Sequence, residues 1–402
     1  MSFLKESYNL NINPFEEGKI PHKNQLDMWV NREKELNDWI NIIERANQTN
    51  RNFLSFVVGS YGRGKTLSLF KIYEISFEKY KNTFPIYTTL KGEQKTKPGI
   101  DVVQRIFRNT QFDLILARKS IRLVRKALES LPQEFEEPKN VFSNILYASK
   151  DLKQMTLDES LGFDNLVKID NKKTENAKLA KFYLTGDIKP TQTQLKKLGI
   201  IRKMENIDIA KEYLIAFLWI LKRLGFNSTI ICVDEFEYLF GLVPKNQQGI
   251  YLALFRGLYD LTVGSSVSNK DISNLVFFCG ISESGYSRLN VQKDSADDAV
   301  GPVYPLMDRV DLVTILRKFT KKEAVKLIVK RLSLNRVTNK FEDKPLIPFT
   351  DDFVEFVYAN SLGLPRDIVV FCTHVLDAGT ADKIPKLTAK YAKAVLEERG
   401  VL

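Results

Sequence analysis

Apolar positions recur in two ways in the first ninety residues. After a polar lead-in, apolar side chains return every three or four positions from near Asn31 to about Glu44, which predicts a helix. Residues 54–58 form a short apolar run that predicts a strand, and a glycine-rich segment over residues 59–66 follows directly. Helical spacing of apolar residues then resumes. The predicted order is strand, glycine loop and helix.

Further apolar runs predict strands over residues 85–90, 229–233, 275–279 and 312–316. Residues 99–225 lie between two of these strands and have a polar, helical pattern, with one very apolar helix at residues 207–224. Residues 264–269 and 285–304 are polar and are expected to be loops. Strands that alternate with helices indicate an α/β fold with a parallel sheet.

The same pattern divides the chain into four parts. Residues 1–95 hold an N-terminal segment and the first part of the sheet domain, and residues 96–226 form a largely helical insertion. Residues 227–319 complete the sheet domain, and residues 320–402 form a helical C-terminal domain.

Composition excludes several classes of protein. The chain has 402 residues, 44% of them hydrophobic and 27% charged, which is typical of a folded globular protein with about two or three domains. No apolar run reaches the ~20 residues of a membrane helix, and the N-terminus lacks a secretory signal, so a cytoplasmic location without membrane contact is expected. Three separate cysteines and two histidines do not suggest a disulfide framework or a zinc site. Carboxylates, hydroxyls and phosphates are the expected metal ligands.

The formal net charge of +11 indicates which partners the protein could bind. A basic protein favours polyanions such as nucleic acids, although a lysine-rich surface that serves only solubility gives the same number.

The glycine-rich segment matches the phosphate-binding pattern G-x-x-x-x-G-K-[ST] at every position. Its residues are Gly59, Ser60, Tyr61, Gly62, Arg63, Gly64, Lys65 and Thr66. Glycines allow the backbone to wrap around phosphates, and the following helix contributes its N-terminal N–H groups. We expect Lys65 to reach the β- and γ-phosphates of ATP and the Thr66 hydroxyl to bind Mg²⁺.

Two acidic residues end the predicted strand at residues 229–233. We assign Asp234 to the Mg²⁺ shell and Glu235 to the attacking water. Ser282 follows the strand at residues 275–279 and is expected to point toward the γ-phosphate, with Ser284 as the alternative.

Three segments around these motifs resemble the AAA+ ATPases of the origin-recognition type, over roughly residues 30–90 and 227–379. Residues 31–36 look like the Arg-Glu-x-Glu box of that branch, residues 314–324 are similar to its last strand and the start of its lid, and residues 361–366 look like its sensor-two motif. The resemblance implies a P-loop NTPase sheet of AAA+ type with a helical insertion, followed by a C-terminal helical lid.

The resemblance also implies roles for single residues. Arg32 would flank the adenine, and Arg366 would contact the γ-phosphate from the lid. Arg309 falls where such ATPases carry an arginine finger that reaches a neighbouring subunit, with Arg288 and Arg317 as competing candidates. A finger implies a homo-oligomer or hetero-complex.

A looser resemblance covers part of the insertion. The segments that carry it look like P-loop ATP-binding proteins of BREX-type phage-defence systems, and they are residues 180–187, residues 195–200, the helix that leads into Gly225 and Phe226, and residues 233–239. About 36 residues follow Arg366, too few for the winged helix that origin initiators append, so autonomous origin binding is not expected.

Basic residues cluster in the insertion between residues 105 and 126. Spacings of three and four place Arg118, Arg122 and Arg125 on one predicted helix face, which suits contacts with DNA phosphates regardless of sequence. A solvated helix face is the alternative interpretation.

These observations predict an ATPase that hydrolyses ATP with Mg²⁺ and couples nucleotide state to assembly on duplex DNA, in a phage-defence or other DNA-transaction complex. Two alternatives remain open. One is a loader or regulator for replication or transposition, and the other is a slow nucleotide-dependent switch or scaffold that acts on a protein partner.

Overall fold

The computed structural model describes residues 3–16, 26–92, 97–148, 173–241, 243–260, 268, 270–294 and 306–402. The chain divides into two compact units. Met1–Asn37, Gly59–Leu67 and Ile315–Leu402 form the unit that we call the helical unit. Asp38–Val58 and Ser68–Thr314 form the sheet unit.

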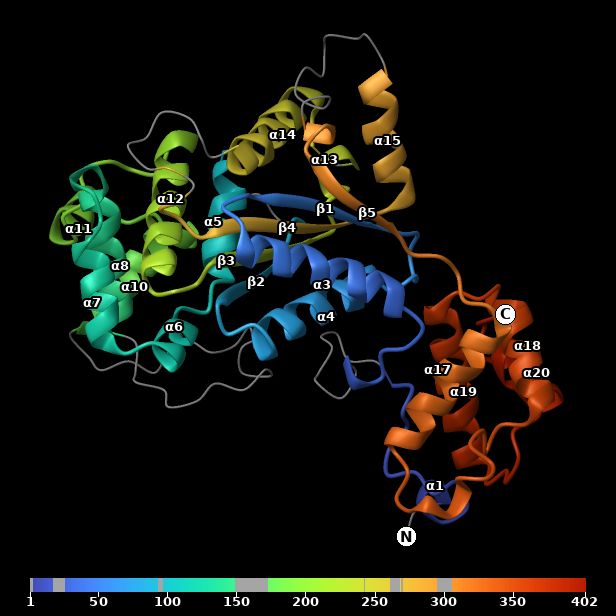
Figure 1. Cartoon of the computed structure of the whole chain (residues 1–402). Helices are drawn as coiled ribbons and strands as arrows, with labels where there is room; N and C mark the ends of the chain where they lie inside the picture. The colour runs from blue at the N-terminus through green and yellow to red at the C-terminus, as the bar shows by residue number, and fades with distance from the viewer. Residues whose placement is uncertain are drawn as a thin grey trace. The chain divides into compact units, whose positions relative to one another are not determined.

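Five strands form one sheet in the order β2-β3-β4-β1-β5 (Figure 1). Their bounds are β1 Phe53–Val58, β2 Thr83–Thr89, β3 Ser228–Asp234, β4 Asn274–Ile281 and β5 Val310–Ile315. The strands are parallel, so the predicted α/β fold with a parallel sheet is confirmed, and each strand ends within one or two residues of its predicted bounds. Every position of β1, β3 and β4 is buried, as expected for parallel strands covered on both faces.

Two helices adjoin the first strand in sequence: α3 (Glu33–Gln48) precedes β1 and α4 (Lys65–Glu78) follows the glycine loop. Between β3 and the last strand, the described helices include α13 Tyr238–Gly241, α14 Lys245–Asp260 and α15 Glu283–Asp294. The prediction of a loop over residues 285–304 is therefore wrong for residues 285–294. Ser282 caps this helix, since the Gly285 N–H donates to its Oγ at 3.1 Å. A serine at a helix start is a helix signal, but the polar residues that follow it favoured the prediction of a loop. The remaining ten residues of that predicted loop, and nearly all of the loop predicted at 264–269, lie outside the described residues.

All regular elements described between β2 and β3 are helical. They are α5 Ile100–Arg108, α6 Phe112–Arg118, α7 Ile121–Glu129, η1 Gln133–Phe135, α8 Glu136–Ala148, α10 Lys173–Thr185, α11 Gln192–Lys197 and α12 Ile207–Arg223. Helix α12 packs against α5, α7 and α8 (Figure 1). The exact boundaries of the four parts predicted from the sequence stay a prediction.

Aromatic rings join these helices to the sheet. Phe217 of α12 is fully buried and contacts Phe107 of α5, Phe112 of α6 and Phe142 of α8. It also contacts Phe84 of β2 edge to face, with ring centroids 5.8 Å apart. The helices between β2 and β3 therefore share their hydrophobic core with the edge strand of the sheet.

The helical unit has its own core. Its elements are α1 Phe3–Ser7, α17 Lys321–Leu334, η3 Asn339–Phe341, α18 Asp351–Ser361, α19 Pro365–Ala381 and α20 Ala389–Glu398. Tyr8, Leu10 and Phe15 are fully buried in this core, so part of the predicted polar lead-in is a structural segment. The aperiodic spacing of these three residues gives no helix or strand signal, and only the tertiary fold shows their burial.

None of the helices in the described part of the chain combines the length and the apolar character that crossing a bilayer requires.

Candidate nucleotide-binding site

The glycine loop belongs to the helical unit and has a backbone that only glycine adopts easily. Gly62 and Gly64 have φ of +80° and +91°, in the left-handed region. A Cβ at Gly64 would meet no atom within 4 Å, so the space beside the loop is open at this point. Such a loop turns its backbone N–H groups toward an anion, which fits the phosphate groups of a nucleotide.

Lys65 and Thr66 are the first two residues of α4. The Lys65 ammonium group donates to the carbonyl oxygen of Gly59 at 2.9 Å, which folds the side chain back across the loop. Thr66 is exposed. Loop backbone, helix N-terminus and ammonium group together form a donor set for phosphate.

Arg366 lies beside the same loop, at the start of α19. Its N–H donates to the carbonyl oxygen of Gly62 at 3.3 Å, and a Cβ at Gly62 would come within 3.2 Å of the Arg366 Cβ. The Arg366 guanidinium group lies 4.4 Å from the centre of the exposed Tyr61 ring. Arg366 therefore lies beside the glycine loop, and its contact with a γ-phosphate stays a prediction.

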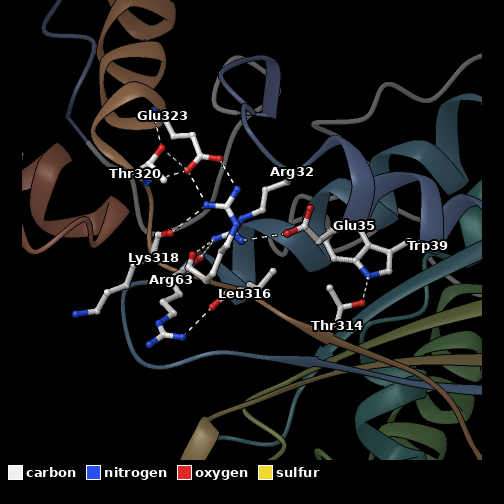
Figure 2. A network of polar contacts seen from close by, with 10 residues as sticks. Arg32, Glu35, Trp39, Arg63, Thr314, Leu316, Lys318, Thr320 and Glu323 are labelled. Atoms are coloured by element: carbon white, nitrogen blue, oxygen red, sulfur yellow. Dashed lines mark hydrogen bonds and ion pairs between the residues drawn. The ribbon is translucent and has the colours of Figure 1, made fainter.

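Arg32 has a buried guanidinium group, with only 4% of the side chain exposed (Figure 2). One nitrogen donates to the carbonyl oxygens of Arg317 and Arg63, at 2.7 and 3.4 Å, and another donates to Glu35 at 3.3 Å. Burial lowers the pKa of Arg32. Contact of Arg32 with the adenine stays a prediction, and the bonds observed here connect it to protein groups.

Glu323 makes a bidentate ion pair with Arg317 and completes a capping box with Thr320 at the start of α17 (Figure 2). The hydrogen bond from Arg317 is the main reason that the pKa of Glu323 falls to about 2. Arg317, one of the candidate fingers, therefore has a partner within its own chain.

Asp234 ends β3 in the sheet unit and is buried, at 4% exposure. Its Oδ1 accepts the N–H of Glu235 at 2.9 Å, and its Oδ2 accepts the hydroxyl of Tyr87 at 2.8 Å. Tyr87 lies on the neighbouring strand β2, and its ring stacks on Phe70 with centroids 4.2 Å apart. Burial, together with the Asp234 charge, raises the pKa of Tyr87 well above 10, so it remains a neutral donor.

Tyr87 is a residue of this site that sequence reasoning missed. The pattern at residues 83–89 predicted a strand, but nothing in the sequence states that this strand lies beside β3.

Glu235 follows with φ of +56°, a left-handed conformation that is uncommon for a residue other than glycine. Its side chain is 44% exposed, and the Lys91 ammonium group lies 3.9 Å from Oε1. This carboxylate lies just beyond the strand, next to the buried Asp234, and its role as a general base stays a prediction.

Ser282 follows β4 and lies at the same edge of the sheet as Asp234, because β3 and β4 are parallel. Besides capping α15, its hydroxyl lies 3.3 Å from that of Ser284. Its role at a γ-phosphate stays a prediction.

Arg309 makes a bidentate ion pair with Asp260 of α14, at 2.6 and 2.8 Å. A finger role would require Arg309 to leave this partner. Arg288 lies on α15 and is exposed. The choice among Arg309, Arg288 and Arg317 as a finger stays a prediction.

The prediction of a single basic helix in the insertion is wrong. Helix α6 ends at Arg118 and α7 begins at Ile121, so Arg118 does not share a helix with Arg122 and Arg125. Arg118 donates to the carbonyl oxygens of Thr83 and Phe77, which is a structural role. Arg122 and Arg125 are exposed on α7, and their contact with DNA stays a prediction.

Comparison with solved structures identifies a similar fold. The ORC2 protein of Aeropyrum pernix, solved as ADPNP and ADP complexes, superposes with a TM-score of 0.51 at 11% identity, over 96% of this chain and 71% of that chain. The chain therefore shares the AAA+ fold of this protein. At this identity the similarity concerns the fold alone.

A second AAA+ structure is more distant. The RuvB Holliday junction branch migration motor of Thermotoga maritima aligns with a TM-score of 0.39 at 12% identity, over 92% of this chain and 69% of that chain. Comparisons with protein-family models and with curated proteins find no match to this sequence.

Tyr87→Phe tests the environment of Asp234. The ring still stacks on Phe70, but Asp234 loses the donor that fixes its Oδ2. We expect the Mg²⁺ concentration for half-maximal ATP turnover to rise about tenfold, because groups that orient a metal ligand affect metal affinity on this scale.

Tyr183→Phe is the matched control, since Tyr183 is also buried and donates one hydrogen bond, to the Arg202 carbonyl oxygen at 2.8 Å. An unchanged Mg²⁺ requirement in Tyr87→Phe would exclude this role.

Proposed function

We propose that the chain is an ATPase that binds ATP with Mg²⁺ and hydrolyses it to ADP and phosphate. The observation that carries the proposal is the glycine loop, with its left-handed glycines, the folded-back Lys65 and the adjoining Arg366. The AAA+ fold supports it.

Asp234 and Glu235 lie at the end of β3, and the glycine loop follows β1 along the chain. Gly59 is bonded to Val58, the last residue of β1, and β1, β4 and β3 are consecutive parallel strands in the sheet. The carboxyl ends of parallel strands lie at one edge of a sheet, where α/β proteins bind ligands. This edge supports a role for Asp234 and Glu235 in ligand binding.

Bound nucleotide would bring its phosphates to the loop, and Mg²⁺ would bring the charge that polarises the terminal phosphate. Lys65 would hold the β- and γ-phosphates, while Thr66 and Asp234 would hold Mg²⁺. Glu235 would orient and deprotonate the attacking water, and Arg366 would contact the terminal phosphate.

The proposed ATPase would also contact duplex DNA and other subunits. The net charge of +11 and the exposed Arg122 and Arg125 support non-specific contact with duplex DNA. Arg309 supports a homo-oligomer or hetero-complex in which one subunit completes the site of another. The resemblance to BREX-type ATP-binding proteins favours phage defence over replication or transposition.

Glu235→Gln tests hydrolysis separately from binding. The amide cannot accept the proton of water, so we expect turnover to fall by about 100-fold or more, while ATP binds within about threefold of the wild-type affinity. Steady-state phosphate release and calorimetry give the two values. Glu205→Gln, at another exposed glutamate, controls for the lost charge. Equal losses of binding and turnover in Glu235→Gln would contradict the role of a general base.

Replacing both Arg122 and Arg125 by alanine tests the DNA surface. Each phosphate contact releases about one counterion, so we expect weaker duplex binding and a logarithmic salt slope that is smaller by about two. Fluorescence anisotropy at several salt concentrations measures both. Lys196→Ala with Lys197→Ala removes the same charge from another exposed part of the insertion. If the two double variants changed duplex affinity and salt slope equally, α7 would contribute only to the net charge of the chain and not to a specific DNA surface.

A further inference from the structure

A ring of contacts within the helical unit begins and ends at the glycine loop. The loop contacts Arg32 on one side, through the carbonyl oxygen of Arg63, and Arg366 on the other, through the carbonyl oxygen of Gly62. The segment at residues 316–320, which we call the linker, and the turn before α19 close the ring.

Arginine side chains hold the linker close to the loop. Arg63, within the loop, donates to the carbonyl oxygen of Leu316 at 2.9 Å (Figure 2). Arg32 donates to the carbonyl oxygen of Arg317 at 2.7 Å. A Cβ on Gly59 would come within 3.3 Å of the Leu316 Cβ, so the start of the loop and the linker are in close approach.

Phe319 connects this linker to the turn that carries Arg366. Its ring lies beneath the Arg32 guanidinium group, whose centre is 5.3 Å from the ring centroid. Its N–H donates to the carbonyl oxygen of Gly363 at 2.8 Å. Gly363 has φ of +74°, and a Cβ there would come within 2.2 Å of the Phe319 carbonyl oxygen, so the turn fits the linker only with glycine.

The position of this turn determines where Arg366 lies. Pro365 is the first residue of α19, and Arg366 follows, so the N–H of Arg366 is one of the donors that a helix leaves without a partner inside the helix. The Gly62 carbonyl oxygen accepts it. A displacement of the linker would therefore move the guanidinium group of Arg366 relative to the loop.

We propose that Arg32 is a positioning residue, which sets the place of Arg366 at the phosphate-binding loop through Arg317 and Phe319, and that it does not read the adenine base. Its buried side chain makes three hydrogen bonds to protein groups and covers an aromatic ring. Asn31 adds a bond from its side-chain amide to the Glu323 carbonyl oxygen at 2.8 Å, so the adjoining residue holds the start of α17 as well.

This inference rests on the proposed function, because Arg366 affects nucleotide choice only if the loop binds ATP. The distinguishing quantity is the ratio of the dissociation constants for ADP and ATP, since only ATP offers Arg366 a γ-phosphate. A residue that contacts the base would instead change the ratio for GTP and ATP.

The experiment measures both ratios in the full chain for wild type, Arg32→Lys, Arg366→Ala and the double variant. Lysine keeps the charge but cannot span two carbonyl oxygens and stack on the ring. We expect Arg32→Lys to lower the preference for ATP over ADP by about tenfold, the scale of one charge-assisted hydrogen bond. In the Arg366→Ala background it should cause no further loss, and the preference for ATP over GTP should stay unchanged.

Arg336→Lys is the matched control. Arg336 also donates to backbone carbonyl oxygens, among them those of Tyr8 and Pro345, and lies 5.3 Å from the Phe341 ring, within the same unit and without a contact to the loop. Phe319→Leu is a second test that leaves the Arg32 side chain intact, and we expect a smaller loss of ATP preference that also disappears with Arg366→Ala.

Three results would overturn the proposal. A loss of the same size with and without Arg366, or a changed preference between ATP and GTP, would show that Arg32 acts directly on the nucleotide. If Arg32→Lys and Arg336→Lys lowered the preference for ATP over ADP equally, Arg32 would contribute only to the general stability of the unit. By contrast, a wild-type chain that binds no ATP would refute the proposed function itself, and this inference with it.

Discussion

An anion-binding loop needs backbone N–H groups that converge on one point, and convergence requires positive φ angles. Gly62 and Gly64 provide these angles. Because Gly62 has no side chain, Arg366 can approach the loop closely, and the space beside Gly64 stays open. The position of Lys65 at the start of α4, the approach of the linker to Gly59 and the capping of α19 by Gly62 all depend on this turn. A single larger residue at Gly62 would disturb both the conformation of the loop and the position of Arg366.

The sheet contributes a different kind of constraint. Parallel pairing brings the ends of β3 and β4 to one edge, where Asp234 is buried and Glu235 is left partly exposed by its left-handed backbone. Two adjacent carboxylates thereby acquire different surroundings, which is consistent with the different roles proposed for them. Tyr87 strengthens this difference, because its hydroxyl is a neutral donor to Asp234 alone.

The sequence predicted features that depend on local patterns. Apolar runs predicted the five strands of the described sheet, and the spacing of glycines predicted the loop before α4, since both are determined by neighbouring residues. It could not predict that β2 pairs with β3, that α6 ends before Ser120, or that Tyr8 lies in the core of the helical unit. These features depend on strand order and on packing between residues far apart in the chain. Arg32 shows the same limit: its motif predicted a nucleotide contact, whereas its hydrogen bonds to the linker required the tertiary structure.

The proposed function depends on binding of the ATP phosphates by the glycine loop. Calorimetric titration of the full chain with ATP, with and without Mg²⁺, beside Lys65→Ala, measures this binding. We expect saturable binding that Mg²⁺ strengthens in the wild type and that falls by at least about tenfold in the variant, because the ammonium group proposed to meet the phosphates is lost. Equal binding by the two proteins, or no binding by either, would contradict it.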